Sequence, residues 1–472
     1  MIKLEMRNFD LIIIGAGAGG FAAAIRANEL KAKTLLINFG LPLGGTCVNV
    51  GCVPSKALLY AGKILHLAKH HGFSGIELEV KNFNFQKVVE DELFLVERLR
   101  YEKYEKVLKN LEYVTTIEGK AKFVSQNKIE VNDEKLRGEK FIIATGSTAN
   151  VPSIEGIREV GFLTHIEALK MKRQPKGLIV VGAGPLGLEF AQMFSRFGTK
   201  VTILQRGDSI LPNLEKELVN RLVEILTKEG IAIKTNVKIK SAKKRNGIKT
   251  ISFIKDGKQE EVSGEEILLA TGKTPNTLML GLETVGVKID KHQAIIVDKY
   301  LQTSNPNIFA VGDVINNPLR LETTAGREGT LAAENALKDK KLSIDYLTVP
   351  YTIFTDPQLA GVGLTEEKQM KQMGVCACRT VSFENIPKAI IMRQTEGMIK
   401  MVIHPQTKQI LGVHILAPNA GELIAEVMML VKNKNTIEEV INSLPVFPTF
   451  SEAIKIVALS FSKNITQLSC CI

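Results

Sequence analysis

Two glycine-rich turns, each set between an apolar run and a helix-like stretch, constrain the fold of this chain more than any other feature. The first turn lies in FDLIIIGAGAGGFAAAIRANEL and the second in GLIVVGAGPLGLEFAQMFSRFGTKVTIL. Both have the spacing G-x-G-x-x-G. The glycines are Gly15, Gly17 and Gly20 in the first turn and Gly182, Gly184 and Gly187 in the second.

In this spacing the first glycine permits a tight turn, the second lets backbone approach a pyrophosphate, and the third lets the helix pack on the strand. The N-terminus of the helix then faces the phosphates with its partial positive charge. Both units reach the end of a second strand 23 positions after the first glycine, at Asn38 and Gln205. The repeat therefore predicts two βαβ units and two bound dinucleotides.

The residues at the ends of the second strands differ in a way that bears on cofactor choice. Asn38 is able to hydrogen-bond a ribose but carries no charge. Gln205 is followed by Arg206, which suits a 2′-phosphate that a carboxylate at this place would repel. We therefore expect the second unit to prefer NADPH.

Two further short strands, FIIATGS and ILLATGKTPNT, end in Ala-Thr-Gly, and each closes one nucleotide unit. They make Thr145 and Gly146 candidates for contacts with the first cofactor and Gly272 a candidate for the second. A third segment, TSNPNIFAVGDV, places Gly312 and Asp313 directly after another short strand.

The segment GGTCVNVGCVPSK carries Cys47 and Cys52 shortly after the first unit. Five residues of regular helix separate Cα atoms by about 8–9 Å, more than the roughly 6.8 Å that a disulfide tolerates. A bridge needs an irregular chain, which the glycines and proline here permit, with a helix from about Cys52 to Lys69. Because a helix N-terminus stabilises thiolates, we interpret the cysteines as a redox pair rather than two unlinked buried residues. The preceding Gly45 and Thr46 are candidates for the first cofactor.

Lys56 lies one turn beyond Cys52, and Glu189 opens the helix after the second glycine turn. An ion pair between them would join the two cofactor sites at one place.

Together these motifs resemble the pyridine-nucleotide disulfide oxidoreductases over essentially the whole chain. The resemblance implies an α/β fold with two Rossmann-like nucleotide-binding domains, for FAD and NADPH, and a C-terminal α+β dimerisation domain that completes the active site of the partner in a homodimer. The expected segments are 1–152 (FAD domain, first part), 153–278 (NAD(P)H domain), 279–345 (return to the FAD domain) and 346–472 (dimerisation domain).

The same resemblance implies roles for individual residues. FAD would occupy the first unit, with Asp313 at its ribityl or phosphate region. Cys52 would lie against the flavin and Cys47 would be the interchange thiol. Lys56 would approach the flavin N5.

A late loop separates members of this family from one another. Disulfide-reducing members carry His-Pro-Thr-x-Ser-Glu there, whereas this chain reads Phe447-Pro-Thr-Phe-Ser-Glu, and none of its seven histidines lies near the loop in sequence. Loss of a general acid–base group removes a contribution of roughly 10²–10⁴-fold. The loop therefore disfavours dihydrolipoyl dehydrogenase and glutathione reductase.

The tail FSKNITQLSCCI and the segment LRYEKYEKVL are similar to those of mercuric reductases. Adjacent Cα atoms lie about 3.8 Å apart, below the usual range for a disulfide, so Cys470 and Cys471 are expected as free thiols. The resemblance implies that they capture Hg(II) and pass it to Cys47 and Cys52 of the other subunit, with Tyr104 by the metal. The tyrosine that this family carries at position 447 is replaced by phenylalanine, and we expect the chain to be the catalytic core without the N-terminal metal-binding domain.

Two other functions stay open from the sequence. One is an NAD(P)H-dependent reductase of another small disulfide or soft-metal substrate, similar to dihydrolipoyl dehydrogenase. The other is a non-catalytic thiol scaffold, which the intact glycine turns and cysteine pair disfavour.

The remaining thiols and imidazoles carry weaker expectations. Cys376 and Cys378, spaced Cys-x-Cys, would face the same side if they lay on one strand. We interpret them as ordinary packing or surface thiols, with an auxiliary metal contact as the alternative. His66, His70 and His71 are expected to be surface residues of a helix rather than metal ligands.

Composition sets limits on partners and location. The net charge is +11, but the 61 basic residues are scattered and lack interleaved aromatic residues, so no nucleic-acid partner is expected. No apolar run approaches the roughly 20 residues of a membrane span. With no signal peptide and only six cysteines, a cytoplasmic protein is the expectation.

Overall fold

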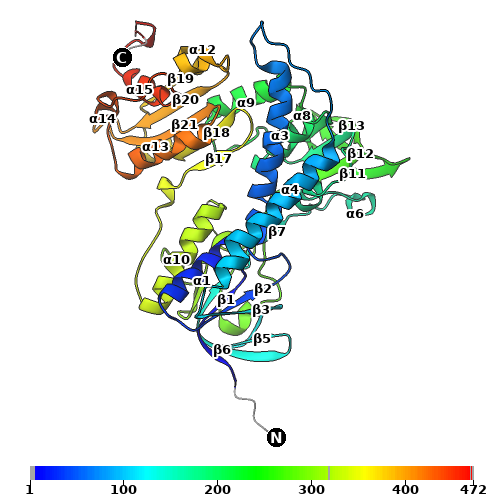
Figure 1. The fold of residues 1–472 in the computed structure, drawn as a ribbon, viewed down its shortest axis with the longest axis vertical. Helices are drawn as coiled ribbons and strands as arrows, with labels where there is room; N and C mark the ends of the chain where they lie inside the picture. Colours follow the sequence, from blue (N-terminus) through cyan, green and yellow to red (C-terminus); the bar gives the residue numbers. More distant parts are fainter. Residues whose placement is uncertain (1–5, 317–318, 468, 470–472) are drawn as a thin grey trace.

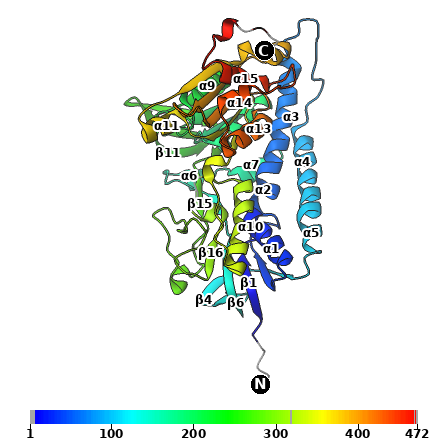
Figure 2. The ribbon, with the colours of Figure 1, turned by 90° about the vertical axis from the view of Figure 1, so that its left-hand side faces the viewer.

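The computed structural model describes residues 6–316, 319–467 and 469. The chain forms three lobes, two of them side by side and a third below them in the view of Figure 1. The helices α3 (Cys52–His70) and α4 (Phe85–Arg100) pack against each other and extend from the lowest lobe towards the other two (Figure 2). None of the helices among the described residues is long and apolar enough to cross a membrane.

The lowest lobe is built on a seven-stranded sheet in the order β3-β2-β1-β6-β5-β4, with β16 also paired to β6. Residues 11–14 and 35–37 are buried on both faces, as expected for parallel strands covered by helices. The strands are β1 (Asn8–Ile14), β2 (Thr34–Asn38), β3 (Val114–Glu118), β4 (Lys122–Ser125), β5 (Lys128–Val131), β6 (Glu134–Ile143) and β16 (Ile308–Ala310).

Two helices of this lobe, α1 (Ala18–Glu29) and α10 (Glu322–Lys338), pack tightly against each other (Figure 1). Glycine makes the approach possible, because a Cβ on Gly329 would lie 2.0 Å from the carbonyl oxygen of Gly19. The chain thus leaves this lobe after β6 and returns to it for β16 and α10.

The second lobe repeats the same arrangement with the strand order β10-β9-β8-β14, all parallel, and adds an antiparallel sheet β11-β12-β13. Its helices are α6 (Ile157–Val160), α7 (His165–Leu169), α8 (Pro185–Arg196) and α9 (Lys216–Lys228). Its strands are β8 (Gly177–Val181), β9 (Lys200–Leu204), β10 (Ala232–Lys234), β11 (Lys238–Arg245), β12 (Ile248–Lys255), β13 (Lys258–Gly264) and β14 (Glu266–Leu269).

The third lobe is a five-stranded antiparallel sheet in the order β17-β18-β21-β20-β19. Helices α13 and α15 contribute buried residues to the same core as this sheet. The strands are β17 (Tyr351–Ile353), β18 (Gln358–Gly363), β19 (Cys378–Ser382), β20 (Met398–Ile403) and β21 (Ile410–Ala417), and the helices are α11 (Glu366–Met373), α12 (Pro387–Ile391), α13 (Ala420–Lys432), α14 (Ile437–Ile441) and α15 (Glu452–Leu459).

A two-stranded ribbon marks the crossing between the first two lobes. Strand β7 (Ser147–Ala149) leads out of the first lobe, and β15 (Lys273–Pro275) pairs with it on the way back. The predicted fold class, two Rossmann-like domains with an α+β domain, is confirmed. The individual domain boundaries stay a prediction.

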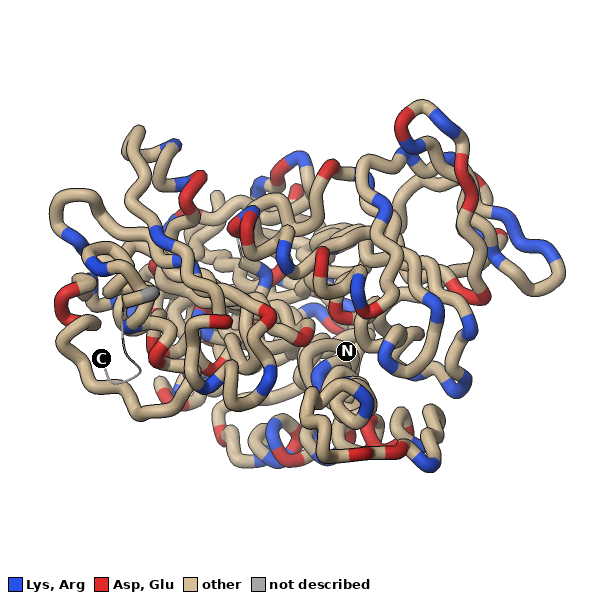
Figure 3. Tube along the Cα trace, turned by 90° about the horizontal axis from the view of Figure 1, so that it is seen from above, with Lys and Arg blue, Asp and Glu red and all other residues tan. Residues whose placement is uncertain are grey.

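Lysine and arginine residues are spread over all parts of the molecule and alternate with acidic residues (Figure 3). This distribution agrees with the scatter of the basic residues along the sequence.

Candidate functional site

A cavity of about 330 Å³ lies where the first two lobes meet. Residues far apart in the sequence line it, from the starts of α1, α3 and α8 and from the turn after β16. Among them are Gly17, Cys47, Cys52, Lys56, Glu189 and Asp313. The fold thus brings the two cysteines, Lys56 and Glu189 together with Gly17 of the first glycine turn, whereas the other five glycines of the two turns do not line the cavity.

The first glycine turn is shaped for close backbone approach. Gly15 has φ +110°, which favours glycine, and a Cβ on Gly20 would lie 1.8 Å from the carbonyl oxygen of Gly15. Gly17 differs, because the nearest heavy atom to a Cβ there would be the Cα of Gly45, 3.8 Å away. The protein therefore does not fill the space over Gly17, the N-cap of α1, where a pyrophosphate would be held.

The second glycine turn has the same construction. Gly182 has φ +105°, and a Cβ on Gly187 would lie 2.1 Å from the carbonyl oxygen of Gly182. A Cβ on Gly184, the N-cap of α8, would meet no heavy atom within 4 Å, so the protein leaves this space open as well. Both turns therefore fit a dinucleotide phosphate.

The Ala-Thr-Gly segments occupy equivalent positions in the two lobes. The Thr145 hydroxyl donates to the carbonyl oxygen of Asn276 at 2.8 Å, which ties the two crossing strands together. Gly146 and Gly272 have φ +67° and +98°, and a Cβ would meet no heavy atom within 4 Å at either residue. Their contacts with cofactors stay predictions.

The residues at the ends of the second strands have partners that the sequence did not reveal. Asn38 Nδ2 donates to Glu118 Oε2 at 3.1 Å, and Glu118 lies opposite Asn38 in the register of β2 and β3. A carboxylate therefore does stand at the end of the first unit, on a neighbouring strand. Only the pairing of β2 with β3 could have shown it.

In the second unit the Gln205 side chain supports the glycine turn. Its Oε1 accepts from the backbone N–H of Ala183 at 3.1 Å and its Nε2 donates to the carbonyl oxygen of Ser209 at 3.2 Å. The neighbouring Arg206 is exposed. Of the two, Arg206 is thus the group available to an anionic ligand.

Asp313 also lines the cavity, and Ser147 Oγ donates to its Oδ2 at 2.7 Å. Two further basic residues, which no sequence motif marks, line the same region. His165 Nε2 lies 3.1 Å from Lys273 Nζ. Burial and the nearby ammonium lower the pKa of His165 to about 4, so this imidazole is neutral at physiological pH.

The two cysteines lie on either side of a break between two helices. Helix α2 (Gly45–Val50) carries Cys47, Gly51 interrupts the helix with φ −133° and ψ −112°, and α3 begins at Cys52. A Cβ on Gly51 would lie 2.8 Å from the carbonyl oxygen of Thr46, so the break requires glycine. The chain is therefore irregular where the sequence predicted, and α3 starts at the predicted residue.

Both cysteines are free thiols in this structure, and their sulfur atoms interact with each other. A hydrogen bond from the Cys47 thiol and the Lys56 ammonium hold the pKa of Cys52 at about 7, against the effect of burial. The hydrogen bond to Cys52 and burial raise the pKa of Cys47. The pair thus carries one thiolate near neutral pH, at the first residue of α3.

Lys56 and Glu189 form the ion pair that the sequence suggested. Lys56 Nζ lies 2.8 Å from Glu189 Oε2, and the Lys56 ammonium lies 4.6 Å from the ring centroid of Phe354. The backbone N–H of Phe354 donates to Glu189 Oε1 at 2.9 Å. The Glu189 side chain is only 7% exposed, so its charge depends on these partners.

Tyr104 packs beside the cysteine segment without lining the cavity. It lies on the short π-helix η1 (Tyr101–Glu105), and its ring meets that of Phe21 edge-on at 4.9 Å. A Cβ on Gly44 would lie 2.9 Å from its ring. Burial raises the pKa of Tyr104 to about 12, so its hydroxyl is protonated. A role beside a metal stays a prediction.

The late C-terminal loop belongs to the third lobe. Phe447 is 53% exposed and does not line the cavity of its own chain. Glu452 Oε2 accepts from the backbone N–H of Thr449 at 3.1 Å. The tail cysteines Cys470 and Cys471 lie outside the described residues.

On α3 the rings of His66 and His70 stack with their centroids 4.3 Å apart, and His66 is half-buried whereas His70 is exposed. That they are surface residues rather than metal ligands stays a prediction.

Comparisons with known proteins agree with this site. Residues 9–329 match the family model of the pyridine nucleotide-disulphide oxidoreductases, and residues 349–458 match the dimerisation domain of that family. A mercuric reductase of Staphylococcus aureus is 38% identical over 466 residues, which cover 98% of this chain and 84% of the relative. A mercuric reductase of Streptomyces lividans is 36% identical over 471 residues, 98% of each protein.

A solved structure supports the fold. The Cu(II) complex of the HOCl-induced flavoprotein disulfide reductase RclA from Escherichia coli is similar with a TM-score of 0.86 and 27% identity, covering 97% of this chain and 100% of that one. The third lobe therefore corresponds to the dimerisation domain. The chain belongs to the pyridine nucleotide-disulphide oxidoreductases, and among them to the mercuric reductase family.

Proposed function

We propose that this chain reduces Hg(II) to Hg(0) with electrons from NADPH. The observation that carries the proposal is the pair Cys47 and Cys52, on either side of the break between α2 and α3, in the cavity between two glycine turns that each leave room for a dinucleotide. The relatives named mercuric reductases support mercury as the substrate.

FAD and NADPH are the cofactors of this family, and the residues at the two turns fit them. The first turn with Thr145, Gly146 and Asp313 would hold FAD, and the second turn with Arg206 would hold NADPH. When bound, FAD would take a hydride from NADPH and deliver two electrons to Hg(II) held by the thiolates.

The chain's own residues account for how the metal is held. Hg(II) is a soft cation and prefers thiolate ligands. Cys52 supplies a thiolate near neutral pH, and Cys47 loses its proton as the metal binds. Lys56 stabilises the negative charge on the Cys52 sulfur, and Glu189 keeps Lys56 in place.

The loop at Phe447 favours a metal substrate over a disulfide. Reduction of a disulfide requires protonation of the leaving thiolate, a step that a general acid accelerates. Phe447 has no titratable group. Exchange of thiolate ligands on a soft metal needs no such acid, so the phenylalanine is compatible with Hg(II).

The delivery route and cellular location are part of the proposal. Cys470 and Cys471 of one subunit would capture Hg(II) and pass it to Cys47 and Cys52 of the other, so that the dimer shares each active site. Six cysteines in a chain of 472 residues do not suggest a structural disulfide framework, and we therefore place the enzyme in the cytoplasm.

The test is Hg(II)-dependent oxidation of NADPH by the FAD-loaded protein in excess small thiol. We expect turnover by the full chain. Changing Cys470→Ala and Cys471→Ala together should lower the rate at limiting Hg(II) by about tenfold or more, because capture would lose both thiolate ligands. Rapid oxidation of dihydrolipoamide without any response to Hg(II), or a panel of disulfides reduced equally well after loss of the tail cysteines, would contradict the proposal.

The preference for NADPH makes a separate prediction. Arg206→Ala should raise the KM for NADPH about 10- to 100-fold, because a hydrogen bond to a charged group contributes about 1.5–3 kcal/mol. The KM for NADH should stay nearly unchanged. Steady-state kinetics with both nucleotides measures the effect, and Arg245→Ala, an exposed arginine of the same lobe, is the matched control. Equal losses with NADPH and NADH would show that Arg206 does not read the 2′-phosphate.

A further inference from the structure

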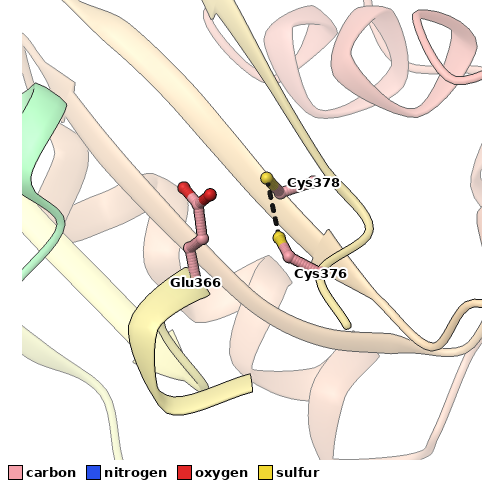
Figure 4. Close-up of side chains that lie close together, drawn as sticks. All are labelled: Glu366, Cys376 and Cys378. Carbon is pink, nitrogen blue, oxygen red and sulfur yellow. Dashed lines mark hydrogen bonds between the residues drawn. The ribbon is translucent and has the colours of Figure 1, made fainter. Parts of the chain in front are cut away.

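A second group of thiols lies in the third lobe, outside the cavity. The sulfur atoms of Cys376 and Cys378 are 3.0 Å apart, and a carboxylate oxygen of Glu366 joins them in a cluster whose ligand atoms all lie within 4.8 Å of one another. Figure 4 shows the three side chains converging from α11, the loop that follows it and the start of β19. All three residues are half-buried.

The two cysteines do not share a strand. In the structure β19 begins only at Cys378, and Cys376 lies in the preceding loop. The fold still brings their sulfur atoms together, and it adds Glu366, which the Cys-x-Cys spacing could not indicate.

A buried glutamine holds the loop that shapes this cluster. Gly374 ends α11 with φ +69°, where the chain turns back. The side chain of Gln369 is fully buried, accepts from the backbone N–H of Ala377 at 3.1 Å and donates to the carbonyl oxygen of Ile403 at 2.7 Å. The N–H of Ile403 also donates to the carbonyl oxygen of Ala377 at 2.9 Å. Ala377, the residue between the two cysteines, is therefore held to β20 directly through its carbonyl oxygen and through Gln369 at its N–H.

The charges around the cluster keep one ligand ionised and the two thiols neutral. Glu366 pairs with the buried ammonium of Lys400, which holds the pKa of that carboxyl below its usual range. Burial raises the pKa of Cys376 to about 12 and also raises that of Cys378. Neutral thiols are poor partners for disulfide exchange, so this pair differs from Cys47 and Cys52. A bound cation would supply the charge needed to deprotonate them.

The geometry suits a tetrahedral cation. With Zn–S bonds of about 2.3 Å, two sulfur ligands of a tetrahedral site lie about 3.8 Å apart, so the pair in this structure needs to open by less than about 1 Å. Linear coordination would place the sulfur atoms on opposite sides of the metal, two bond lengths apart. Two thiolates and one carboxylate also match the ligand types of zinc sites.

We propose that Glu366, Cys376 and Cys378 form a second metal site, which binds a divalent cation of the zinc class through three side chains and leaves a fourth position for water. The site joins the start of α11 to β19. It lies beside the contact between the third lobe and α9, where Lys400 also approaches Glu215 at 3.3 Å and Glu217 at 3.5 Å. The cation would therefore stabilise this contact, and it is distinct from the Hg(II) reduced in the cavity.

The test uses Cd(II), whose thiolate complexes absorb in the ultraviolet, on the FAD-loaded full chain. The parent carries Cys47→Ser, Cys52→Ser, Cys470→Ser and Cys471→Ser, so that Cys376 and Cys378 are its remaining cysteines. In the presence of a phosphine reductant we expect one Cd(II) per chain, the thiolate absorption band, and about two protons released per cation at pH 7.

Removing ligands should weaken binding in a graded way. Adding Cys376→Ser and Cys378→Ser should abolish the absorption band and lower affinity more than about 100-fold. Glu366→Gln should lower affinity about 10-fold, the lower end of the effect of perturbing a metal site. Glu367→Gln, the exposed neighbour, is the matched control and should bind as the parent does.

Three results would overturn the proposal. They are no thiolate band in the parent, Cd(II) binding without proton release, and equal affinity after Cys376→Ser and Cys378→Ser. Stoichiometry and proton release are measured on the parent alone, so they decide the question even if a serine variant fails to fold.

Discussion

We expect Cys52→Ser to lower Hg(II)-dependent NADPH oxidation by roughly a thousandfold or more, the scale seen when a group that bonds the reacting atom is removed. Cys52 is the thiol whose pKa lies at about 7, and the serine hydroxyl is neither ionised at this pH nor a soft ligand. Cys47→Ser should have a loss of similar order, because Hg(II) would keep only one thiolate.

Two measurements separate this loss from misfolding. The variants should retain FAD and should still oxidise NADPH with ferricyanide, an acceptor that needs no thiolate ligand. Near-normal Hg(II) turnover by Cys52→Ser would contradict the assignment.

Local sequence patterns predicted the parts of the site that lie close along the chain. The two glycine turns, the start of α3 at Cys52 and the break at Gly51 follow from short-range sterics, since few residues other than glycine accept those backbone positions. The Lys56–Glu189 pair joins residues 133 positions apart. It was predictable because each residue lies near the start of a helix that follows a recognisable motif.

The remaining parts of the site depend on tertiary pairing and could not be read from local patterns. Glu118 reaches Asn38 only through the register of β2 and β3. His165 and Lys273 meet because the chain crosses between lobes twice. Glu366 joins Cys376 and Cys378 because a buried glutamine folds a loop back onto a helix N-terminus. In each case one contact partner lies on an element whose position the sequence does not state.

The second large effect is expected for Lys56→Met, which removes the cation next to both Cys52 and Glu189. The Lys56 ammonium lowers the pKa of Cys52, whereas the Glu189 carboxylate raises it. Without Lys56 the pKa should therefore rise above about 7 by about one unit or more. A rise of one unit would lower the thiolate fraction at pH 7 about fivefold, and Hg(II) turnover at that pH should fall at least as much. The rate of Cys52 alkylation as a function of pH measures the pKa directly.

Stability should change together with the pKa, because Glu189 would be left buried without its cation. Removing one partner of a buried ion pair costs about 3–5 kcal/mol, and we expect a loss of about 3 kcal/mol in the free energy of unfolding because Lys56 is 32% exposed. Lys63→Met is the matched control. It removes another lysine of α3, paired with Asp356 at 3.1 Å, and should lower stability without moving the pKa of Cys52.

The double variant Lys56→Met with Glu189→Gln distinguishes the two effects of this ion pair. Glutamine leaves no unpaired charge, so most of the lost stability should return. The pKa of Cys52 should also fall back towards about 7, because the carboxylate that raises it is gone. If Lys56 served only to neutralise the buried Glu189 carboxylate, the single variant would lose stability while the pKa of Cys52, measured from the pH dependence of its alkylation, stayed at the wild-type value. If Lys56 sets the charge on the reactive thiol, the pKa of Cys52 should rise in the single variant. It should then fall part of the way back in the double variant.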